Sequence, residues 1–269
     1  MEWHYTVAAQ TDAGIVKPVN QDSLTVKVAN TNYGEAAFAV LCDGMGGLEQ
    51  GEVASSVVVR AYEQWFLREF PHFLAKGFSE SALERIWHQL ANTCNARILD
   101  YGRERSATMG TTLTAMLLLD GRYYISHIGD CRVYVMGNGM EQLTTDQTYV
   151  AREVALGHMT PEQAQNDARR NVLLQCIGTV SSVKPDFLQG DLYAGDSFLV
   201  CSDGFRHSLT DMEVYSYCHT AFENMDWRVE KRLENSHIMN GQLRYLIDMN
   251  KERGERDNIS AILAKAVNV

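Results

Sequence analysis

The sequence lacks several features that would assign it to a special class of protein. No apolar run approaches the ~20 residues that a membrane-spanning helix needs. The first residues, MEWHYTVAAQTD, show no basic segment followed by an apolar core, as a secretory signal would. Basic residues are in the minority, 24 against 34 acidic ones, which gives a formal charge of −10. We therefore expect a cytoplasmic protein with no nucleic acid and no membrane among its partners, because both would repel an acidic chain.

Proline and paired cysteines are also scarce. The 269 residues contain four prolines and no proline-rich or serine-rich linker, and no internal repeat is visible. This pattern predicts a single domain over residues 1–269, a length that one hydrophobic core can serve. The six cysteines form no CxxC pair and no regular spacing. We therefore expect buried, reduced thiols rather than disulfides or a zinc site.

Runs of β-branched and aromatic residues predict seven strands, over residues 23–28, 36–42, 111–119, 123–128, 132–136, 197–201 and 259–267. The dipeptides Asp120-Gly121 and Gly129-Asp130 separate three of these strands, and such turns favour antiparallel hairpins.

Apolar residues at helical spacing predict two early helices, one from about Gly51 to Phe70 and one over 83–98. The second would begin at the capping box Ser81-x-x-Glu84. Further helices are predicted to start at Thr160-Pro161 and at Thr210-x-x-Glu213, and another to span 241–251. Strands joined as hairpins, with helices in two separate blocks, predict an α+β sandwich rather than a doubly wound fold.

Aspartates stand directly at the ends of the predicted strands. Asp43 follows AFAVLC, Asp130 follows YYISHIG, and Asp203 follows SFLVCS. Asp257 precedes NISAIL, and Asp22 stands at the entry to the strand over 23–28. Each one alone is a natural turn or cap residue. Together they favour one acidic cluster, because a carboxylate beside an apolar strand is costly unless it is paired, capped or bound to metal.

An all-carboxylate cluster favours Mg²⁺ or Mn²⁺ over zinc, copper or calcium. Two such ions can lower the pKa of a bridging water and orient a phosphoryl group. Gly44, Gly46 and Gly47 would let the backbone approach an ion or phosphate, although a tight turn explains them equally well. No G-x-G-x-x-G motif or P-loop occurs, so nucleotide binding is not supported.

The sequence resembles the metal-dependent serine/threonine protein phosphatases (PPM, or type two C), particularly their bacterial branch. The matching stretches follow the family's order from about Thr11 to Leu263: TDAGIVKPVNQDSLTV, LCDGMGGLEQGEVAS, MGTTLTAML, SHIGDCRVYV, LTTDQT, RRNVLLQCIG, FLVCSDGF and RDNISAIL. The resemblance implies two antiparallel sheets between helical layers (αββα) and a mobile flap at about 150–170. It also implies hydrolysis of protein phosphoserine or phosphothreonine by metal-activated water.

The resemblance implies roles for single residues as well. Asp43 would bridge two Mn²⁺ or Mg²⁺ ions, and Asp203 and Asp257 would complete the carboxylates of the first ion. These three are the expected catalytic residues. Asp22 and the Gly44 carbonyl would serve the second ion, and Asp130 would join Asp203 at a weaker third ion. The six expected metal ligands are thus Asp22, Asp43, Gly44, Asp130, Asp203 and Asp257.

Two basic residues could contact the substrate phosphate. Lys17 stands where the family usually has a phosphate-binding arginine, and a lysine offers a point charge instead of a bidentate fork. We expect Lys17 to bind the phosphate more weakly without loss of the chemistry. Arg206 could offer a second positive charge, but we expect it to be an exposed surface residue.

Other positions depart from the family pattern, among them the position of the proposed proton donor. Met45 stands where many eukaryotic members carry a histidine proposed as the general acid. His127 is the nearest substitute by sequence, but it alternates with Ile125 along a strand, so we expect a core histidine. Gln147 and Cys131 replace a common histidine and a common serine, and the sequence gives no physical account of either change.

The expected function is a bacterial Ser/Thr protein phosphatase that opposes a Ser/Thr kinase and acts as a monomer. Two alternatives stay open. One is a catalytically silent relative that uses the fold as a binding or signalling module, and the other is a hydrolase of small phosphoesters. Silent members typically lose metal aspartates, whereas Asp43, Asp203 and Asp257 are all present, which favours an enzyme. Only substrate profiling distinguishes a hydrolase of small phosphoesters from a protein phosphatase, because the two share the same site chemistry.

Overall fold

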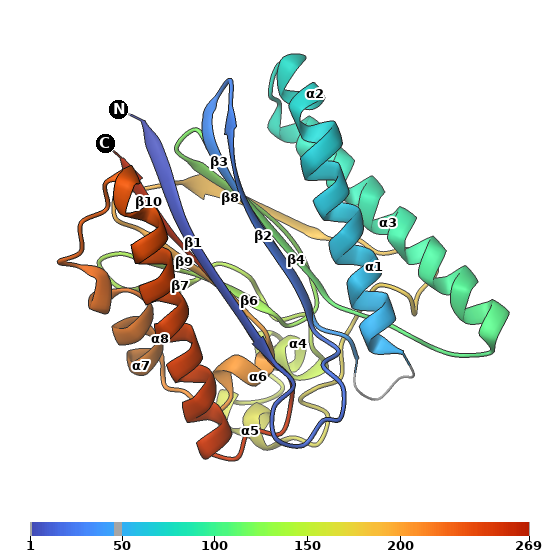
Figure 1. The fold of residues 1–269 in the computed structure, drawn as a ribbon. Coiled ribbons are helices and arrows are strands. Elements are labelled where there is room, and N and C mark those ends of the chain that lie inside the picture. Colours follow the sequence, from blue (N-terminus) through green and yellow to red (C-terminus); the bar gives the residue numbers. More distant parts are fainter. Residues whose placement is uncertain (1, 46–49, 269) are drawn as a thin grey trace.

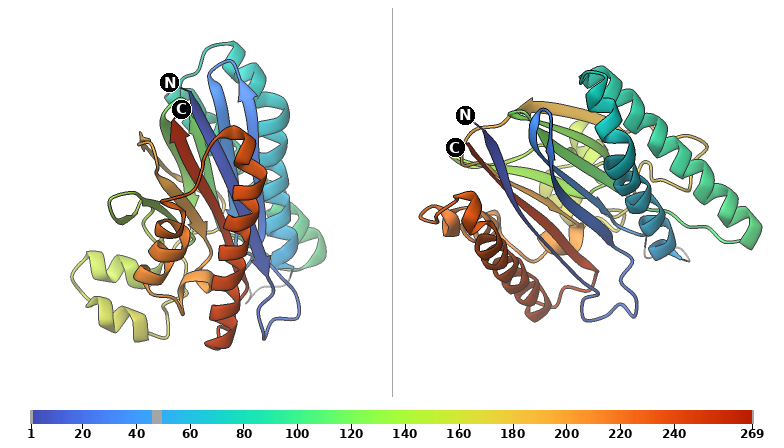
Figure 2. Two further views of the ribbon diagram at one scale, coloured as in Figure 1. Left: turned by 60° about the vertical axis from the view of Figure 1, so that its left-hand side comes forward. Right: turned by 45° about the horizontal axis from the view of Figure 1, so that its top comes forward.

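Two five-stranded antiparallel sheets pack face to face in the computed structural model, which describes residues 2–45 and 50–268 (Figure 1). The first sheet has the order β1-β10-β9-β6-β7, with the bounds β1 (Trp3–Asp12), β6 (Arg132–Met136), β7 (Met140–Gln142), β9 (Ser197–Cys201) and β10 (Ile259–Asn268). The second has the order β2-β3-β4-β5-β8, with the bounds β2 (Ser23–Thr31), β3 (Gly34–Cys42), β4 (Leu113–Leu119), β5 (Arg122–Ile128) and β8 (Asp186–Asp191). The pairing of β1 with β10 brings the two chain ends side by side (Figure 2).

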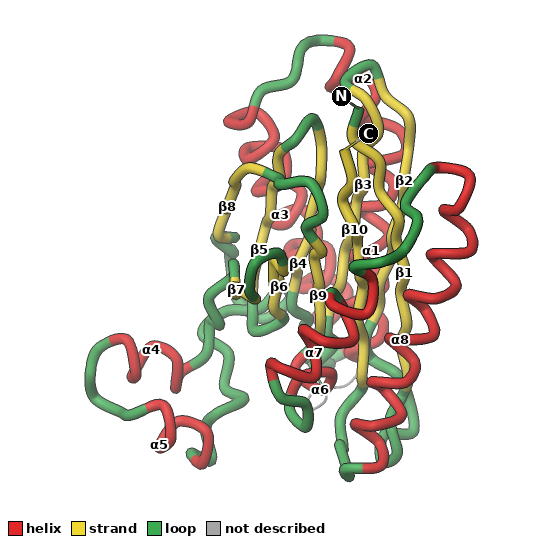
Figure 3. The backbone as a smooth tube through the Cα atoms, turned by 90° about the vertical axis from the view of Figure 1, so that its left-hand side faces the viewer, coloured by secondary structure: helices red, strands yellow, loops and turns green. Residues whose placement is uncertain are grey.

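Helices cover the outer face of each sheet. Those on the second sheet are α1 (Gly51–Gln64), α2 (Phe70–Ala75) and α3 (Glu80–Arg105), and those on the first are α7 (Asp211–Cys218) and α8 (Arg232–Glu252) (Figure 1). The others are α4 (Tyr149–Ala155), α5 (Pro161–Asn166) and α6 (Asp203–Arg206). Figure 3 shows α4 and α5 projecting away from the sheets. This αββα arrangement confirms the predicted α+β sandwich. Within residues 2–45 and 50–268, no helix is long and apolar enough to span a membrane.

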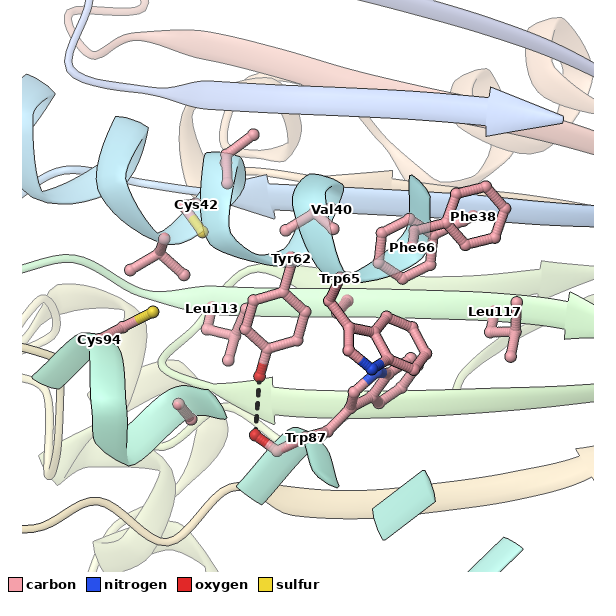
Figure 4. Packing of buried hydrophobic residues seen from close by; sticks show 14 of the residues in the cluster. Phe38, Val40, Cys42, Tyr62, Trp65, Phe66, Trp87, Cys94, Leu113 and Leu117 are labelled. Atoms are coloured by element: carbon pink, nitrogen blue, oxygen red, sulfur yellow. Dashed lines mark hydrogen bonds between the residues drawn. The ribbon is translucent and has the colours of Figure 1, made fainter. Parts of the chain in front are cut away.

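Alternation along the central strands builds a layered core. On β3, Phe38 and Val40 face the helices of the second sheet, while Ala39 and Leu41 pack between the two sheets. A third apolar layer lies between the first sheet and helices α7 and α8. The helix-side layer of the second sheet is rich in aromatic rings, as Figure 4 shows. All six cysteines are buried free thiols, as predicted.

Several predicted elements were wrong in detail. Gly129-Asp130 does not close a hairpin, because β5 pairs with β4 and β8 whereas β6 pairs with β7 and β9. This turn carries the chain from one sheet to the other. The predicted helix from Gly51 to Phe70 ends at Gln64 and is followed by a π-helical segment, Trp65–Glu69. The helix predicted over 241–251 begins nine residues earlier, at Arg232.

Two helix starts differ in capping: α7 has a capping box and α3 has none. This difference predicts unequal effects of two alanine substitutions on stability. At α7, the Thr210 hydroxyl accepts from the Glu213 N–H at 3.3 Å, and the Glu213 carboxylate accepts from the Thr210 N–H at 2.8 Å. The box predicted at Ser81 is wrong, because α3 begins after Ser79 and makes no side-chain cap. We expect Thr210→Ala to lower the free energy of unfolding by about 1 kcal/mol and Ser81→Ala to leave it nearly unchanged. Urea denaturation measures both, and equal losses would contradict the assignment.

Candidate metal centre

The ends of β2 and β3 bring two of the predicted aspartates together. Ser23 and Cys42 pair across the two strands, so Asp22 and Asp43 each stand one residue beyond the same pair. The Asp43 backbone is fixed by Thr112, the residue before β4, since the Asp43 N–H donates to the Thr112 hydroxyl at 2.8 Å. The position of the Asp43 carboxyl is therefore set by three neighbouring strands of the second sheet.

Strand register in the first sheet places three more aspartates at one end. Cys201 of β9 pairs with Arg132 of β6, so Asp203 follows one strand by two residues and Asp130 precedes the other by two. On its other side β9 pairs with β10, which Asp257 precedes by two residues. These three aspartates therefore lie at the ends of adjacent strands.

The five carboxyl groups form one electrostatic cluster that spans both sheets. Burial raises the pKa of Asp43 well above its usual range, and the neighbouring carboxylates raise it further; these are Asp22, Asp203, Asp130 and Asp257. Burial and the nearby Asp203 also raise the pKa of Asp22 and of Asp130, each to about 7. Like charges gathered out of water in this way favour the binding of cations.

Orphaned oxygen atoms show where such a cation would fit. Neither carboxylate oxygen of Asp22 has a hydrogen-bond partner, although both are buried, and the same holds for Oδ1 of Asp203. The donors are all oxygens, which suits Mg²⁺ or Mn²⁺. In the described parts of the chain, no three His, Cys, Asp or Glu side chains are yet arranged to hold an ion.

Lys17 lies inside this cluster, at Asp257. Its Nζ is 3.0 Å from Oδ1 of Asp257, and both side chains are about one-third exposed. The ammonium group partly neutralises the carboxylate that would otherwise serve an ion. The structure thus brings Lys17 to the predicted site, but against a predicted ligand.

Gly44 occupies a position where no side chain fits. A Cβ there would lie 2.5 Å from the carbonyl oxygens of Gln21 and Gly51, and the Gly44 N–H donates to Gln21 at 3.1 Å. This close approach explains the glycine after Asp43 and leaves its carbonyl beside the cluster. The predicted Gly46 and Gly47 lie outside the described residues.

Sequence reasoning missed Asn258, which fastens the loop before β2. Its Oδ1 accepts from the Gln21 N–H at 2.9 Å, and its Nδ2 donates to the carbonyls of Ala13 and Val19. Asn258 thereby ties the segment that carries Lys17 and Asp22 to the start of β10.

His207 and Glu255 were also missed, and they support Asp203. The His207 ring lies 3.5 Å from Glu255 and 3.7 Å from Oδ2 of Asp203. Glu255 also accepts the backbone N–H of Asp257 at 2.9 Å. Although burial opposes it, hydrogen bonding from His207 and the backbone lowers the pKa of Glu255 to about 2. The Glu255 carboxylate is therefore charged, and it contacts both His207, which lies beside Asp203, and the backbone of Asp257.

Other predicted positions are structural. His127 is fully buried, as expected, with Nδ1 3.0 Å from the Thr114 hydroxyl and Nε2 3.0 Å from the Gly129 carbonyl. Gln147 now has a physical account, because its side chain accepts from the Gly129 N–H and donates to Asp186. It fixes the turn that precedes Asp130.

Cys131 is buried beneath the Asp43 backbone, with its sulfur 3.3 Å from the Thr112 hydroxyl that accepts from the Asp43 N–H. Met45 lies on the same side, where its N–H donates to the Gly110 carbonyl at 3.0 Å. Both residues stand where other family members carry a polar side chain. In this structure the neighbouring groups that contact Cys131 and Met45 have partners without it.

The expectation that Arg206 is exposed was wrong. Its side chain is 19% exposed and lies 3.5 Å from Asp146, whose two oxygens Arg132 already binds at 2.8 Å each. Arg206 also lowers the pKa of the neighbouring Asp130, against the effect of burial. It lines a groove of about 1060 Å³ between α4–α5 and α6–α7, which Asp130 also lines. Arg206 thus adds a positive charge at the edge of the cluster.

A comparison with protein families decides what these residues belong to. The family described as Protein phosphatase 2C matches residues 15–246. The chain belongs to the protein phosphatase 2C family. The matched range includes Lys17 and four of the five aspartates, and Asp257 lies beyond it.

Individual members of the protein phosphatase 2C family agree with this assignment. The serine/threonine protein phosphatase PstP of Mycobacterium tuberculosis is 31% identical over 261 residues, which are 97% of this chain and 45% of that protein. This chain therefore spans about half the length of that relative. The structure of an S. agalactiae serine/threonine phosphatase has a TM-score of 0.80 at 26% identity, over 98% of this chain and 100% of the other. The catalytic domain of PstP in complex with two manganese ions has a TM-score of 0.75 at 27% identity, over 99% and 100%.

Proposed function

We propose that this member of the protein phosphatase 2C family hydrolyses phosphoserine and phosphothreonine in proteins. The observation that carries the proposal is the cluster of five aspartates with buried, unpartnered oxygens on Asp22 and Asp203. Relatives named Ser/Thr phosphatases, one of them with two manganese ions, support it. A silent binding module would not need to keep this costly group of charges.

We assign the residues as follows. Asp43 would be shared by two Mn²⁺ or Mg²⁺ ions, Asp203 and Asp257 would hold the first, and Asp22 with the Gly44 carbonyl would hold the second. When bound, such ions lower the pKa of a water molecule and neutralise charge on a phosphoryl group. Asp130 and Asp203 are the candidates for a weaker third ion. His207 and Glu255 hold Asp203 in place.

A groove beside the cluster offers a path for the substrate chain. The groove that Asp130 and Arg206 line is walled on one side by α4 and α5, which fall within the segment of about 150–170 that we interpret as the flap. Phosphoprotein specificity would then depend on the flap, since loops carry most recognition differences within a fold. The single domain over 1–269, the cytoplasmic location, the monomeric state, a cognate Ser/Thr kinase and the use of Mg²⁺ stay predictions.

A metal-dependence assay on two substrates tests the function. We expect phosphate release from a phosphothreonine peptide only with Mn²⁺ or Mg²⁺, and its loss in EDTA. Asp203→Asn should abolish it, whereas Asp191→Asn, at an exposed carboxylate of β8, should not. Metal-independent turnover would overturn the mechanism. Turnover of p-nitrophenyl phosphate without turnover of the peptide would favour the small-phosphoester hydrolase.

Lys17 gives a prediction with two separate readouts. If Lys17 binds the substrate phosphate, Lys17→Ala should raise KM for the phosphopeptide about tenfold with kcat little changed, and Lys17→Arg should restore or lower KM. Because Lys17 is paired with Asp257 at 3.0 Å, Lys17→Ala should also strengthen Mn²⁺ binding measured by calorimetry. An unchanged KM with tighter Mn²⁺ binding would show that Lys17 only neutralises Asp257.

A further inference from the structure

A second pocket, of about 520 Å³, lies at the opposite end of β9 from the aspartate cluster. It is bounded by the turn after β6, the turn before β9, the C-terminal end of α7 and the last residues of β10. Ser197 marks this end of β9, and Asp203 lies beyond the other end, about 20 Å away at ~3.3 Å per residue. The pocket shares no lining residue with the groove beside Asp130.

Lys265 is the buried charge of this pocket. Its side chain is 4% exposed, and Nζ donates to the Gly195 carbonyl and to the Ser197 hydroxyl. No carboxylate among the described residues lies within 4.0 Å of it. An ammonium group has three donors, so one is left for another partner. A buried charge without an ion partner is costly, and burial accordingly lowers the pKa of Lys265.

His219 supplies a second donor through the same serine. Oγ of Ser197 lies 3.1 Å from Nδ1 of His219 and also accepts from Lys265. When the Ser197 hydroxyl donates to Nδ1, the imidazole proton is on Nε2, because a neutral imidazole carries one N–H. Nε2 makes no hydrogen bond to any other described residue. In this tautomer Lys265 and His219 both offer N–H groups to an incoming acceptor.

Aromatic rings form the walls of the pocket. Trp227 is fixed by its indole N–H, which donates to the Phe222 carbonyl at 3.3 Å, and Lys265 Nζ lies 5.9 Å from its ring centroid. Tyr215 stacks on His219 with centroids 5.1 Å apart. Tyr193, at the mouth, is 71% exposed. Such walls suit a planar apolar group.

Two carboxylates complete the lining, Asp196 and Glu223. Asp196 is buried at 7% exposure and accepts from the Tyr193 N–H at 2.9 Å, while Glu223 is exposed. Both act on Lys265 electrostatically, although neither forms an ion pair with it. A simple anion would be repelled by these acids, and a simple amine would be repelled by the lysine.

We propose that this pocket binds a small zwitterion with an aromatic side chain, that is, an aromatic α-amino acid. Its carboxylate accepts from Lys265 and His219, its ammonium group lies toward Asp196 and Glu223, and its ring packs against Trp227. The pocket is distinct from the aspartate cluster, so this binding does not depend on the proposed phosphatase activity.

The test uses ¹⁵N-labelled full-length protein without added metal or phosphopeptide. The indole N–H signal of Trp227 is assigned with Trp227→Phe and followed during titration with L-phenylalanine, 3-phenylpropionate and phenethylamine. We expect a saturable shift with L-phenylalanine and binding about tenfold or more weaker for each analogue, which lacks one charged group. The absence of a saturable shift, or equal affinity for 3-phenylpropionate, would overturn the proposal.

Two variants test which side chains contact the charged groups of the ligand. Lys265→Met and Glu223→Gln should each weaken L-phenylalanine binding about tenfold, and the exposed Asp191→Asn should leave it unchanged. Glu223→Gln changes an exposed side chain, so it remains informative even if Lys265→Met fails to fold. Unchanged affinity in Glu223→Gln would remove the ammonium contact and overturn the zwitterion assignment.

Discussion

Asp43→Asn is expected to lower kcat for phosphopeptide hydrolysis at least about 10³-fold while it raises the thermal stability of the metal-free protein. Activity falls because Asp43 is the proposed bridging ligand, and transition-state stabilisation by metal ions is worth several kcal/mol. Stability rises because burial and four neighbouring carboxylates make the Asp43 charge unfavourable without a cation. Asparagine has nearly the same shape and carries no charge.

The two effects separate a metal-binding role from a structural one. Thermal unfolding in EDTA and phosphate release with saturating Mn²⁺ should be measured on the same preparation, with Asp191→Asn as the control. We expect higher stability together with lost activity for Asp43→Asn, and no change in either for the control Asp191→Asn. If Asp43→Asn instead destabilised the protein in EDTA, the aspartate would be a structural cap of the turn after β3.

Central strands were predictable because they are short apolar runs buried on both faces. The sequence located β6 and β9 at the bounds the structure has, 132–136 and 197–201. Strands β1, β7 and β8 were missed, since all three lie at sheet edges and carry polar residues such as His4, Glu141 and Asp186. The Gly129-Asp130 turn was misread because turn chemistry does not say which sheet the following strand joins.

In the candidate site, too, local sequence patterns revealed some residues and missed others. Its aspartates were recognisable because a carboxylate at the end of an apolar strand needs a partner. Asn258 was not, because its role depends on a contact with Gln21, 237 residues away in the chain. Arg206 was predicted on the surface because charged residues are usually exposed, whereas in α6 its side chain is 19% exposed and lies 3.5 Å from Asp146. Long-range contacts of this kind join segments far apart in the chain, so a local pattern does not reveal them.

Metal-free protein is expected to lose stability as pH rises from about 4.5 to about 7.5. The pKa of Asp22 and of Asp130 is near 3.8 in the unfolded chain and is raised to about 7 in the folded protein. Between these values the folded state holds more protons, so the free energy of unfolding falls with pH. One retained proton changes that energy by more than about 1 kcal/mol per pH unit. Buried His127 and His219, whose pKa values are lowered, oppose part of this change.

Saturating Mn²⁺ should reverse this dependence, because ions bind the ionised carboxylates and stabilise the folded state most where protons no longer compete. Urea denaturation at pH 5, 6, 7 and 8, in EDTA and in Mn²⁺, measures both curves. Asp22→Asn should flatten the EDTA curve by removing one proton-binding group, while Asp191→Asn should not change it. A metal-free protein whose stability rises over this range would mean that these carboxyl groups titrate normally, and it would remove the charge cluster on which the proposed metal centre rests.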